Sequence, residues 1–185
     1  ETSMSPDTAA RLPDDLDGCP FPGPPLAGAM IARQRADLTP DEKVAVVGDG
    51  LSAGLVCQLT ATREARVSLF SSNTTLLQKA RKAGVEETFL VGDLWDRTDA
   101  PLVQWADRPR FDCVIETSGR VSALQLAFRV CRSDGRLVLA GTARHAGGAL
   151  RTDLGPSEDF EVVDATACTD ARRVRGLWEA IDSVL

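Results

Sequence analysis

The chain has 185 residues, of which 43% are hydrophobic, and a formal net charge of −6. This length is enough for one domain with a buried core, and no apolar run approaches the roughly eighteen residues that a bilayer span requires. The negative charge argues against nucleic acid and an anionic membrane as partners. The five cysteines are odd in number, far apart and without a C-x-x-C pair. A zinc cluster or disulfide framework is therefore not expected, and a reduced, cytoplasmic location is predicted.

Residues 1–25 are polar, rich in proline and without periodicity, which predicts an extended or partly disordered arm. The three residues ahead of Met4 are interpreted as a vector remnant, with Met4 as the natural first residue. The remaining residues, 26–185, are predicted to form a single domain. Its first element is a helix over 26–38, with Leu26, Met30 and Ile31 on its apolar face.

An apolar run at 44–47 predicts a strand, and a tight glycine–aspartate–glycine turn follows it at 48–50. Leucines at every fourth position from Leu51 to Leu59 then predict a helix. In a dinucleotide-binding βαβ unit, the first glycine makes the turn, the second lets a pyrophosphate approach, and a third small residue lets the helix pack closely. The positive end of the helix then faces the phosphates. The predicted cradle consists of Gly48, Gly50, Leu51, Ser52 and Ala53.

A tight strand-to-helix turn that binds no ligand is the alternative interpretation of this stretch. Asp49, inside the turn, is interpreted as a turn residue. A carboxylate beside a pyrophosphate is unfavourable unless it points away, because the two groups carry the same charge.

The rest of the chain alternates short apolar runs with helical patterns. Strands are predicted at 66–70, 88–91, 112–116, 136–140 and 160–165, and helices at 73–83, 102–106, 122–131 and 170–184. Near-continuous apolar strands separated by helices predict an α/β fold with a parallel sheet covered on both faces. Right-handed crossovers give the doubly wound strand order 3-2-1-4-5-6 of a six-stranded Rossmann fold.

Ligands of such sheets bind outside the carboxyl ends of the strands, where the strand order reverses. Polar and small residues follow three further strands at this edge. They are Ser71, Ser72 and Asn73 after strand two, Thr117 and Ser118 after strand four, and Gly141 after strand five. As alternatives, Thr117 caps the following helix and Gly119 satisfies the turn. His145, beyond strand five, is a candidate general acid or base, and a solvated loop histidine is the alternative.

Four stretches resemble the coenzyme domain of the medium-chain dehydrogenase/reductases, the relatives of zinc alcohol dehydrogenases. They are the strand, turn and helix over 43–59, then Leu77–Gly84, Phe111–Gly119 and Gly135–Gly141. The resemblance runs from about Pro24 to the end of the chain. It implies a Rossmann fold and descent from an NAD(P)-dependent oxidoreductase.

The same resemblance implies that the family's catalytic domain, which supplies the catalytic zinc site, is missing from this chain. Pro24 stands where the family has a glutamate that can lie beside the metal. A catalytic zinc site needs three protein ligands, and one histidine with scattered cysteines does not supply them. We therefore expect no metal ligands and no zinc mechanism in this chain.

The coenzyme is predicted from the end of strand two. An NAD site usually has an aspartate or glutamate there, about 20 residues beyond the glycine turn, to bind the ribose 2′-hydroxyl. Ser71 stands at that position, and Lys79 and Arg81 lie on the next helix. A serine tolerates a 2′-phosphate, which a cation would bind, so NADP is favoured over NAD. A site that has lost both coenzymes is the alternative.

Two functions follow from these patterns. The first is a stand-alone NAD(P)-binding oxidoreductase, or a subunit of one, that lacks catalytic zinc, acts on a small molecule and needs a partner protein or second subunit for the missing half. The second is a dehydrogenase remnant that dimerises through the edge strand at 160–165, as family members often do, and has a non-redox catalytic or scaffolding role in a biosynthetic pathway. A methyltransferase that binds S-adenosylmethionine is a further alternative, which the resemblance disfavours.

Overall fold

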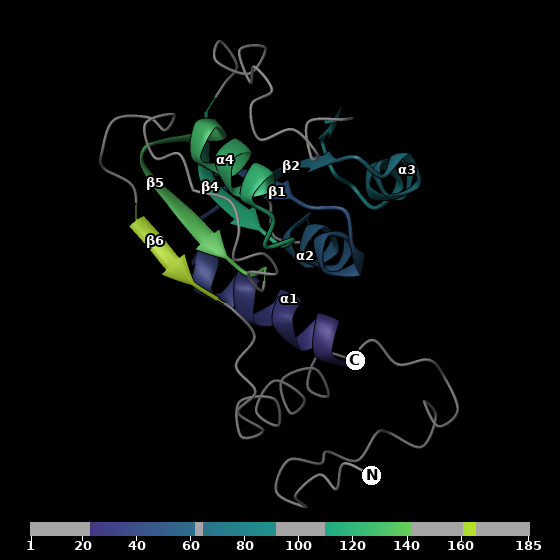
Figure 1. The fold of residues 1–185 in the computed structure, drawn as a ribbon, viewed down its shortest axis with the longest axis horizontal. Helices are drawn as coiled ribbons and strands as arrows, with labels where there is room; N and C mark the ends of the chain where they lie inside the picture. Colours follow the sequence, from purple (N-terminus) through teal and green to yellow (C-terminus); the bar gives the residue numbers. More distant parts are fainter. Residues whose placement is uncertain (1–22, 62–64, 92–109, 142–160, 166–185) are drawn as a thin grey trace, which may run out of the picture.

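A computed structural model describes residues 23–61, 65–91, 110–141 and 161–165 of the chain. Its strands form one six-stranded sheet in the order β3-β2-β1-β4-β5-β6, with every pair parallel (Figure 1). The strands are β1 (Lys43–Val47), β2 (Arg66–Ser71), β3 (Glu87–Leu90), β4 (Phe111–Glu116), β5 (Cys131–Leu139) and β6 (Glu161–Asp164). The predicted fold class and strand order are confirmed.

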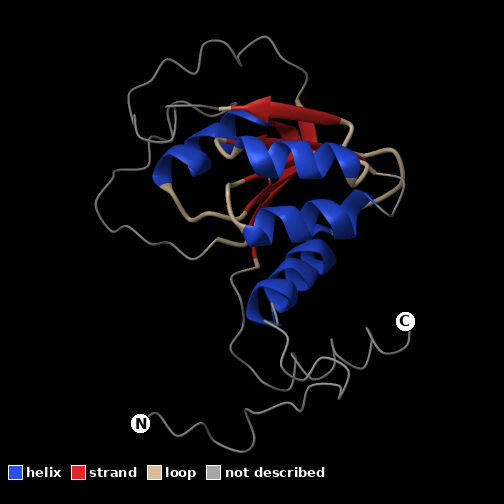
Figure 2. Cartoon of the chain, turned by 90° about the vertical axis from the view of Figure 1, so that its right-hand side faces the viewer, coloured by secondary structure: helices blue, strands red, loops and turns tan. Residues whose placement is uncertain are grey.

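Helices cover both faces of this sheet. They are α1 (Gly23–Ala36), α2 (Leu51–Ala61), α3 (Thr74–Lys82) and α4 (Val121–Val130). The first three share a buried cluster with one face, and α4 shares a second cluster with the other. Figure 2 shows these helices in blue around the red strands. No helix in the described part of the chain is both long and apolar enough to cross a membrane.

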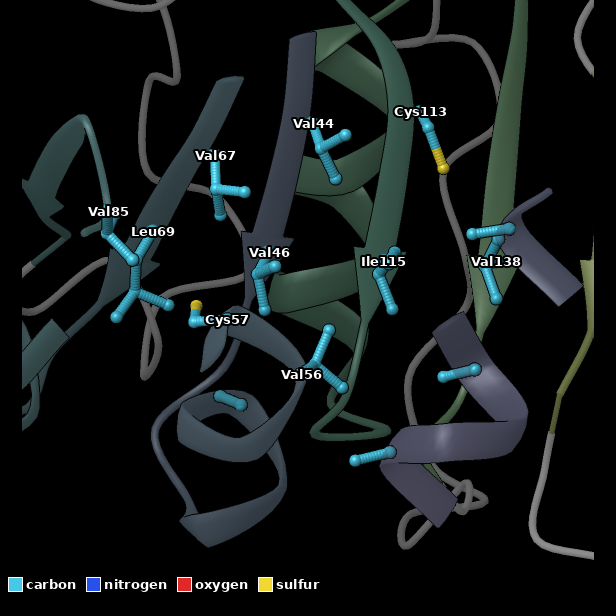
Figure 3. Close-up of a cluster of buried hydrophobic side chains, with 14 of the residues drawn as sticks. Val44, Val46, Val56, Cys57, Val67, Leu69, Val85, Cys113, Ile115 and Val138 are labelled. Atoms are coloured by element: carbon cyan, nitrogen blue, oxygen red, sulfur yellow. The ribbon is translucent and has the colours of Figure 1, made fainter. Parts of the chain in front are cut away.

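The two faces are built from alternate residues of the strands, as the period of a β-strand requires. Val44 and Val46 point toward α2, where Val56 lies below them in Figure 3. Their neighbours Ala45 and Val47 belong to the cluster beneath α4. Because every one of these strand residues is fully buried, β1 is the centre of the core.

Helix α1 differs from its prediction in bounds and in buried face. It covers 23–36 rather than 26–38. Its buried residues are Ala29, Ile31, Ala32 and Ala36. Leu26 and Met30, which were predicted to face the core, are only partly buried. Three of the four buried residues are alanines, which lack bulk and so allow a close approach of α1 to its neighbours.

Strand β5 also begins earlier than predicted. Phe111 on β4 pairs with Cys131, and Cys113 pairs with Arg136, so residues 132–135 of β5 lie opposite Asp112 alone. Residues 132–135, which lie between the predicted helix and the predicted strand, are thus a bulge inside β5. Asp134 in this bulge has a φ of +61°, a left-handed conformation that aspartate tolerates better than most residues.

Arg136 connects β5 to the chain segment between α1 and β1. Its Nε donates to the carbonyl of Ala36 at 2.9 Å, and its NH2 group lies 2.7 and 2.8 Å from the two carboxylate oxygens of Glu42. The same guanidinium therefore satisfies a carbonyl at the end of α1 and pairs with a carboxylate just before β1. These contacts hold α1 against the amino end of the sheet.

Three cysteines of the described chain are free and buried: Cys57, Cys113 and Cys131. Burial raises the pKa of the Cys57 and Cys113 thiols to about 12 and that of Cys131 to about 11. Cys57 and Cys113 are therefore core thiols. Of the arm predicted over 1–25, residues 23–25 begin α1 and residues 1–22 lie outside the described residues. The predicted helices at 102–106 and 170–184 also lie outside them, and the division into arm and single domain stays a prediction.

Candidate functional site

The carboxyl ends of the four central strands meet at one edge, as predicted. The backbone N–H and hydroxyl of Thr117 both donate to the carbonyl of Val47, at 3.0 and 3.1 Å, which joins the ends of β4 and β1. The N–H of Gly48 donates to the carbonyl of Phe70 at 3.0 Å, which joins β1 to β2. The N–H of Gly141 donates to the carbonyl of Glu116 at 3.0 Å, which joins β5 to β4.

Gly48 and Ala53 make the glycine turn compact. A Cβ atom on Gly48 would overlap the hydroxyl oxygen of Thr117 and lie 3.4 Å from the methyl group of Ala53. Ala53 is itself fully buried. The next residue, Gly54, faces α3, where an added Cβ would lie 3.1 Å from a methyl group of Leu76. Small residues are therefore required here by packing alone, whether or not a ligand binds.

Gly50 has a different environment. A Cβ atom added there would meet no atom within 4 Å. The residue immediately precedes α2, whose first residue, Leu51, is 56% exposed. The first N–H groups of a helix have no partner within it and carry partial positive charge. Open space beside these donors fits the phosphates of a dinucleotide.

Asp49 is the residue that links the glycine turn to the end of β2. Its carboxylate oxygen Oδ1 accepts from the hydroxyl of Ser71 at 2.8 Å and from the N–H of Ser72 at 2.6 Å. Its backbone carbonyl lies 3.4 Å from Nδ2 of Asn73. Asn73 also caps α3, because its Oδ1 accepts from the N–H of Leu76 at 3.0 Å. The interpretation of Asp49 as a turn residue missed these tertiary contacts.

The sequence suggested two cations of α3 near the end of β2, but the structure places a different cation there. Lys79 and Arg81 lie in the last turn of α3, about 9 and 12 Å along the helix axis from Asn73. Arg81 donates from Nε to the hydroxyl of Thr88 at 2.6 Å, which directs it away from the end of β2. The guanidinium of Arg120, in contrast, lies 3.9 Å from the Oδ2 atom of Asp49 and is half exposed.

A buried carboxylate lies under the turn after β4. Glu116 is 1% exposed, and its Oε1 accepts from the N–H and the hydroxyl of Ser118, at 2.7 and 2.6 Å, and from the N–H of Gly119 at 2.9 Å. Burial raises the pKa of the Glu116 carboxyl above its ordinary value, although the three donors oppose the shift. The sequence placed Glu116 at the end of the strand but did not predict this role.

The alternatives for the turn after β4 are resolved. Thr117 does not cap α4, because the N-cap position belongs to Arg120, which makes no side-chain cap hydrogen bond. Gly119 does satisfy the turn, since its φ is +69°. Gly141 packs onto the same turn, because a Cβ atom there would collide with the backbone nitrogen of Gly119. His145, the candidate acid or base, lies outside the described residues.

Metal ligands were not expected at this edge. The described segments contain no group of three or more His, Cys, Asp or Glu side chains that could hold a metal ion.

A parallel sheet whose order reverses beside a glycine turn defines a Rossmann-type fold. The family model of the zinc-binding dehydrogenases matches residues 53–178, which is more than half of the chain. The chain therefore belongs to the zinc-binding dehydrogenase family, and the resemblance to the coenzyme domain of zinc alcohol dehydrogenase relatives is confirmed.

Solved structures share this fold. The alcohol dehydrogenase TADH from Thermus sp. ATN1 is 18% identical with a TM-score of 0.67, over 94% of this chain and 50% of that chain. Acetophenone reductase from Geotrichum candidum, in complex with NAD, is 15% identical with a TM-score of 0.64, over 86% and 43%. A protein from Sinorhizobium meliloti bound to NADP is 19% identical with a TM-score of 0.62, over 84% and 47%. The chain thus spans about half the length of each.

Proposed function

We propose that this chain binds a nicotinamide dinucleotide and forms the coenzyme half of an oxidoreductase. The observation that carries the proposal is the open space at Gly50, at the point where the strand order reverses. It lies beside the first N–H groups of α2, which have no partner within the helix. Membership of the zinc-binding dehydrogenase family supports it. The structural relatives in complex with NAD and bound to NADP support this class of coenzyme without favouring either form.

In this proposal the nicotinamide supplies the hydride chemistry, and the chain supplies binding and orientation. The backbone around Gly50, Leu51 and Ser52 binds the pyrophosphate, while Gly48 and Ala53 shape the turn. The remaining residues of the predicted site line the same edge; they are Ser71, Ser72, Asn73, Thr117, Ser118 and Gly141. A partner protein or second subunit supplies the catalytic half and the small-molecule site, without catalytic zinc from this chain. The role of His145 stays a prediction.

Gly50→Ala is expected to weaken NADH and NADPH binding at least about tenfold, because its methyl group fills the space that the pyrophosphate needs. The fold is expected to tolerate the change, since the methyl group meets nothing. Isothermal titration calorimetry of each coenzyme, together with thermal melting, measures both effects. The matched control is Gln58→Ala, at an exposed position of the same helix. Wild-type protein that binds neither coenzyme at millimolar concentration would refute the proposal.

A homodimeric remnant with a non-redox or scaffolding role is the second candidate. The observation that favours it is β6, which forms the end of the sheet and pairs only with β5 among the described strands. Val162 on this strand is 53% exposed. An apolar edge strand is prone to pair with another chain, and two copies of β6 joined edge to edge would continue the sheet.

Val162→Lys is expected to convert a wild-type dimer into a monomer, because it places a charge in the paired edge. Sedimentation equilibrium measures the mass of each species. Leu90→Lys is the matched control, since Leu90 is 56% exposed on β3 at the opposite edge of the sheet. A wild-type monomer, or a dimer that only Leu90→Lys dissociates, would rule out association through β6.

A further inference from the structure

We propose that Asp49 supplies, from the glycine turn, the carboxylate that selects the adenosine ribose of the coenzyme, so that this chain prefers NAD(H) to NADP(H). The inference rests on the proposed function, because it concerns the form of the coenzyme that the same site binds. It also reverses the preference for NADP that the sequence suggested. That preference was based on Ser71, which stands at the end of β2 where an NAD site usually has an acid.

The carboxylate of Asp49 lies against the end of β2. The hydroxyl of Ser71 and the N–H of Ser72 hold its Oδ1 atom at 2.8 and 2.6 Å. An NAD-binding Rossmann site has its ribose-binding acid at the end of this strand. Here the acid comes from the turn after β1, and the last residue of β2 and the residue that follows it provide donors that fix it in place.

The serine predicted to contact the ribose is therefore engaged elsewhere. Ser71 is fully buried. Its hydroxyl donates to Asp49 and accepts from the N–H of Asn73 at 3.1 Å. A hydroxyl that is buried and bonded in both directions is poorly placed to bind a ligand. Ser71 is thus a positioning residue for the Asp49 carboxylate.

The second oxygen of Asp49 is available to a ligand. Among the described residues, Oδ2 has one charged neighbour, the guanidinium of Arg120 at 3.9 Å, which is too far for a direct hydrogen bond. The Asp49 side chain retains 22% of its exposure. An ionised carboxylate oxygen that is fixed, partly exposed and otherwise unused can accept a hydrogen bond from a ribose 2′-hydroxyl.

The same carboxylate disfavours a 2′-phosphate. A phosphate monoester carries a charge of about −1.5 to −2 at neutral pH, so it would repel Asp49 at close range. The cations of α3 that would have bound it, Lys79 and Arg81, lie in the last turn of that helix. The guanidinium of Arg120 already faces Asp49 at 3.9 Å. We therefore expect NADH to bind about ten- to a hundredfold more tightly than NADPH.

Asp49→Asn separates this role from a merely structural one. The amide oxygen of asparagine can still accept from Ser71 and Ser72, so the turn keeps its hydrogen bonds. The negative charge is lost, and an N–H₂ donor takes the position of Oδ2. Weaker NADH binding and stronger NADPH binding are therefore expected from the variant, with a melting temperature close to that of the wild type.

Calorimetric titration of the full chain with NADH and with NADPH tests the inference. The dissociation constant of NADPH divided by that of NADH is expected to fall at least about tenfold in Asp49→Asn. The control is Asp41→Asn, which removes an equal charge at the other end of β1, where a φ of +66° suits asparagine. Its ratio is expected to match the wild type.

The possible outcomes are distinct. Equal affinities of the wild type for both coenzymes, or an unchanged ratio in Asp49→Asn, would overturn this inference and leave the proposed function intact. Tighter wild-type binding of NADPH would also overturn it and would indicate that Arg120 binds the 2′-phosphate. Binding of neither coenzyme would refute the proposed function and this inference together.

Discussion

Glu116→Ala is expected to lower the free energy of unfolding by about 3 kcal/mol, which corresponds to a melting temperature about 10 °C lower. The substitution leaves the N–H groups of Ser118 and Gly119 without their acceptor at a site that is almost fully buried. Each unpaired buried donor costs about 1–3 kcal/mol, and the truncated side chain leaves a void. Urea denaturation and thermal melting measure the loss.

The control for this prediction is Glu87→Ala, which removes an exposed glutamate from β3. It is expected to change stability by no more than about 0.5 kcal/mol. A loss below about 1 kcal/mol in Glu116→Ala would show that the turn after β4 does not depend on its carboxylate.

Glu116 also gives a pH signature. Burial raises the pKa of the Glu116 carboxyl in the folded state above its ordinary value of 4.5. As the pH rises, the unfolded state therefore loses this proton at a lower pH than the folded state does. Stability contributed by Glu116 is therefore complete below pH 4.5 and decreases as the pH rises through the folded pKa. Glu116→Gln is expected to remove this decrease, so the stability of the wild type should fall relative to the variant over that window. An identical pH dependence of the two proteins would contradict the raised pKa.

Gly141→Ala is expected to destabilise the protein by about 3 kcal/mol, because a Cβ atom there collides with the backbone nitrogen of Gly119 and lies 2.8 Å from Oε2 of Glu116. Backbone atoms cannot move aside as the end of a flexible side chain can. The ends of β5 and β4 must therefore separate, which disrupts the hydrogen bond from Gly141 to the carbonyl of Glu116. Chemical denaturation of the purified variant measures the loss.

Gly50→Ala is the matched control for Gly141→Ala, since the same methyl group there meets open space. The double variant with Glu116→Ala adds a second check. Removing the glutamate takes away its contact with the new methyl group and the hydrogen bond that holds the Gly119 backbone in place. The combined loss should therefore be smaller than the sum of the single losses. Strict additivity would mean that Gly141 and Glu116 do not share one packed cluster.

The topology was predictable from the sequence because the physics that sets it is local. The apolar run 44–47 and the helical leucine spacing after it predict a strand–turn–helix unit, and handedness rules then fix the order of the strands. The buried face of α1 was not predictable in the same way. Hydrophobicity ranks Leu26 and Met30 above alanine, whereas close packing against α2 and the sheet selects Ala29 and Ala32.

The candidate site was predictable as a set of strand ends but not as a set of contacts. Parallel strands bring their carboxyl ends together, so residues after 47, 70 and 116 had to meet. The direction of the Asp49 carboxylate depends on donors 22 and 23 residues away, at Ser71 and Ser72. No local pattern encodes that pairing. The one available signal was a charged residue between two glycines, opposite a strand end that lacked the usual acid.

The reactivity of the buried thiols can be used to measure local opening of the fold. A thiol reacts as its thiolate, and Cys57 and Cys113, with pKa values of about 12, hold almost none at neutral pH while they stay buried. Labelling by a soluble thiol reagent must therefore wait for local opening. Cys57 lies in the helix after the glycine turn and Cys113 in the strand beyond the order reversal. The two thiols thus lie on either side of the point where the strand order reverses. If a dinucleotide binds there as proposed, it is expected to slow the labelling of both.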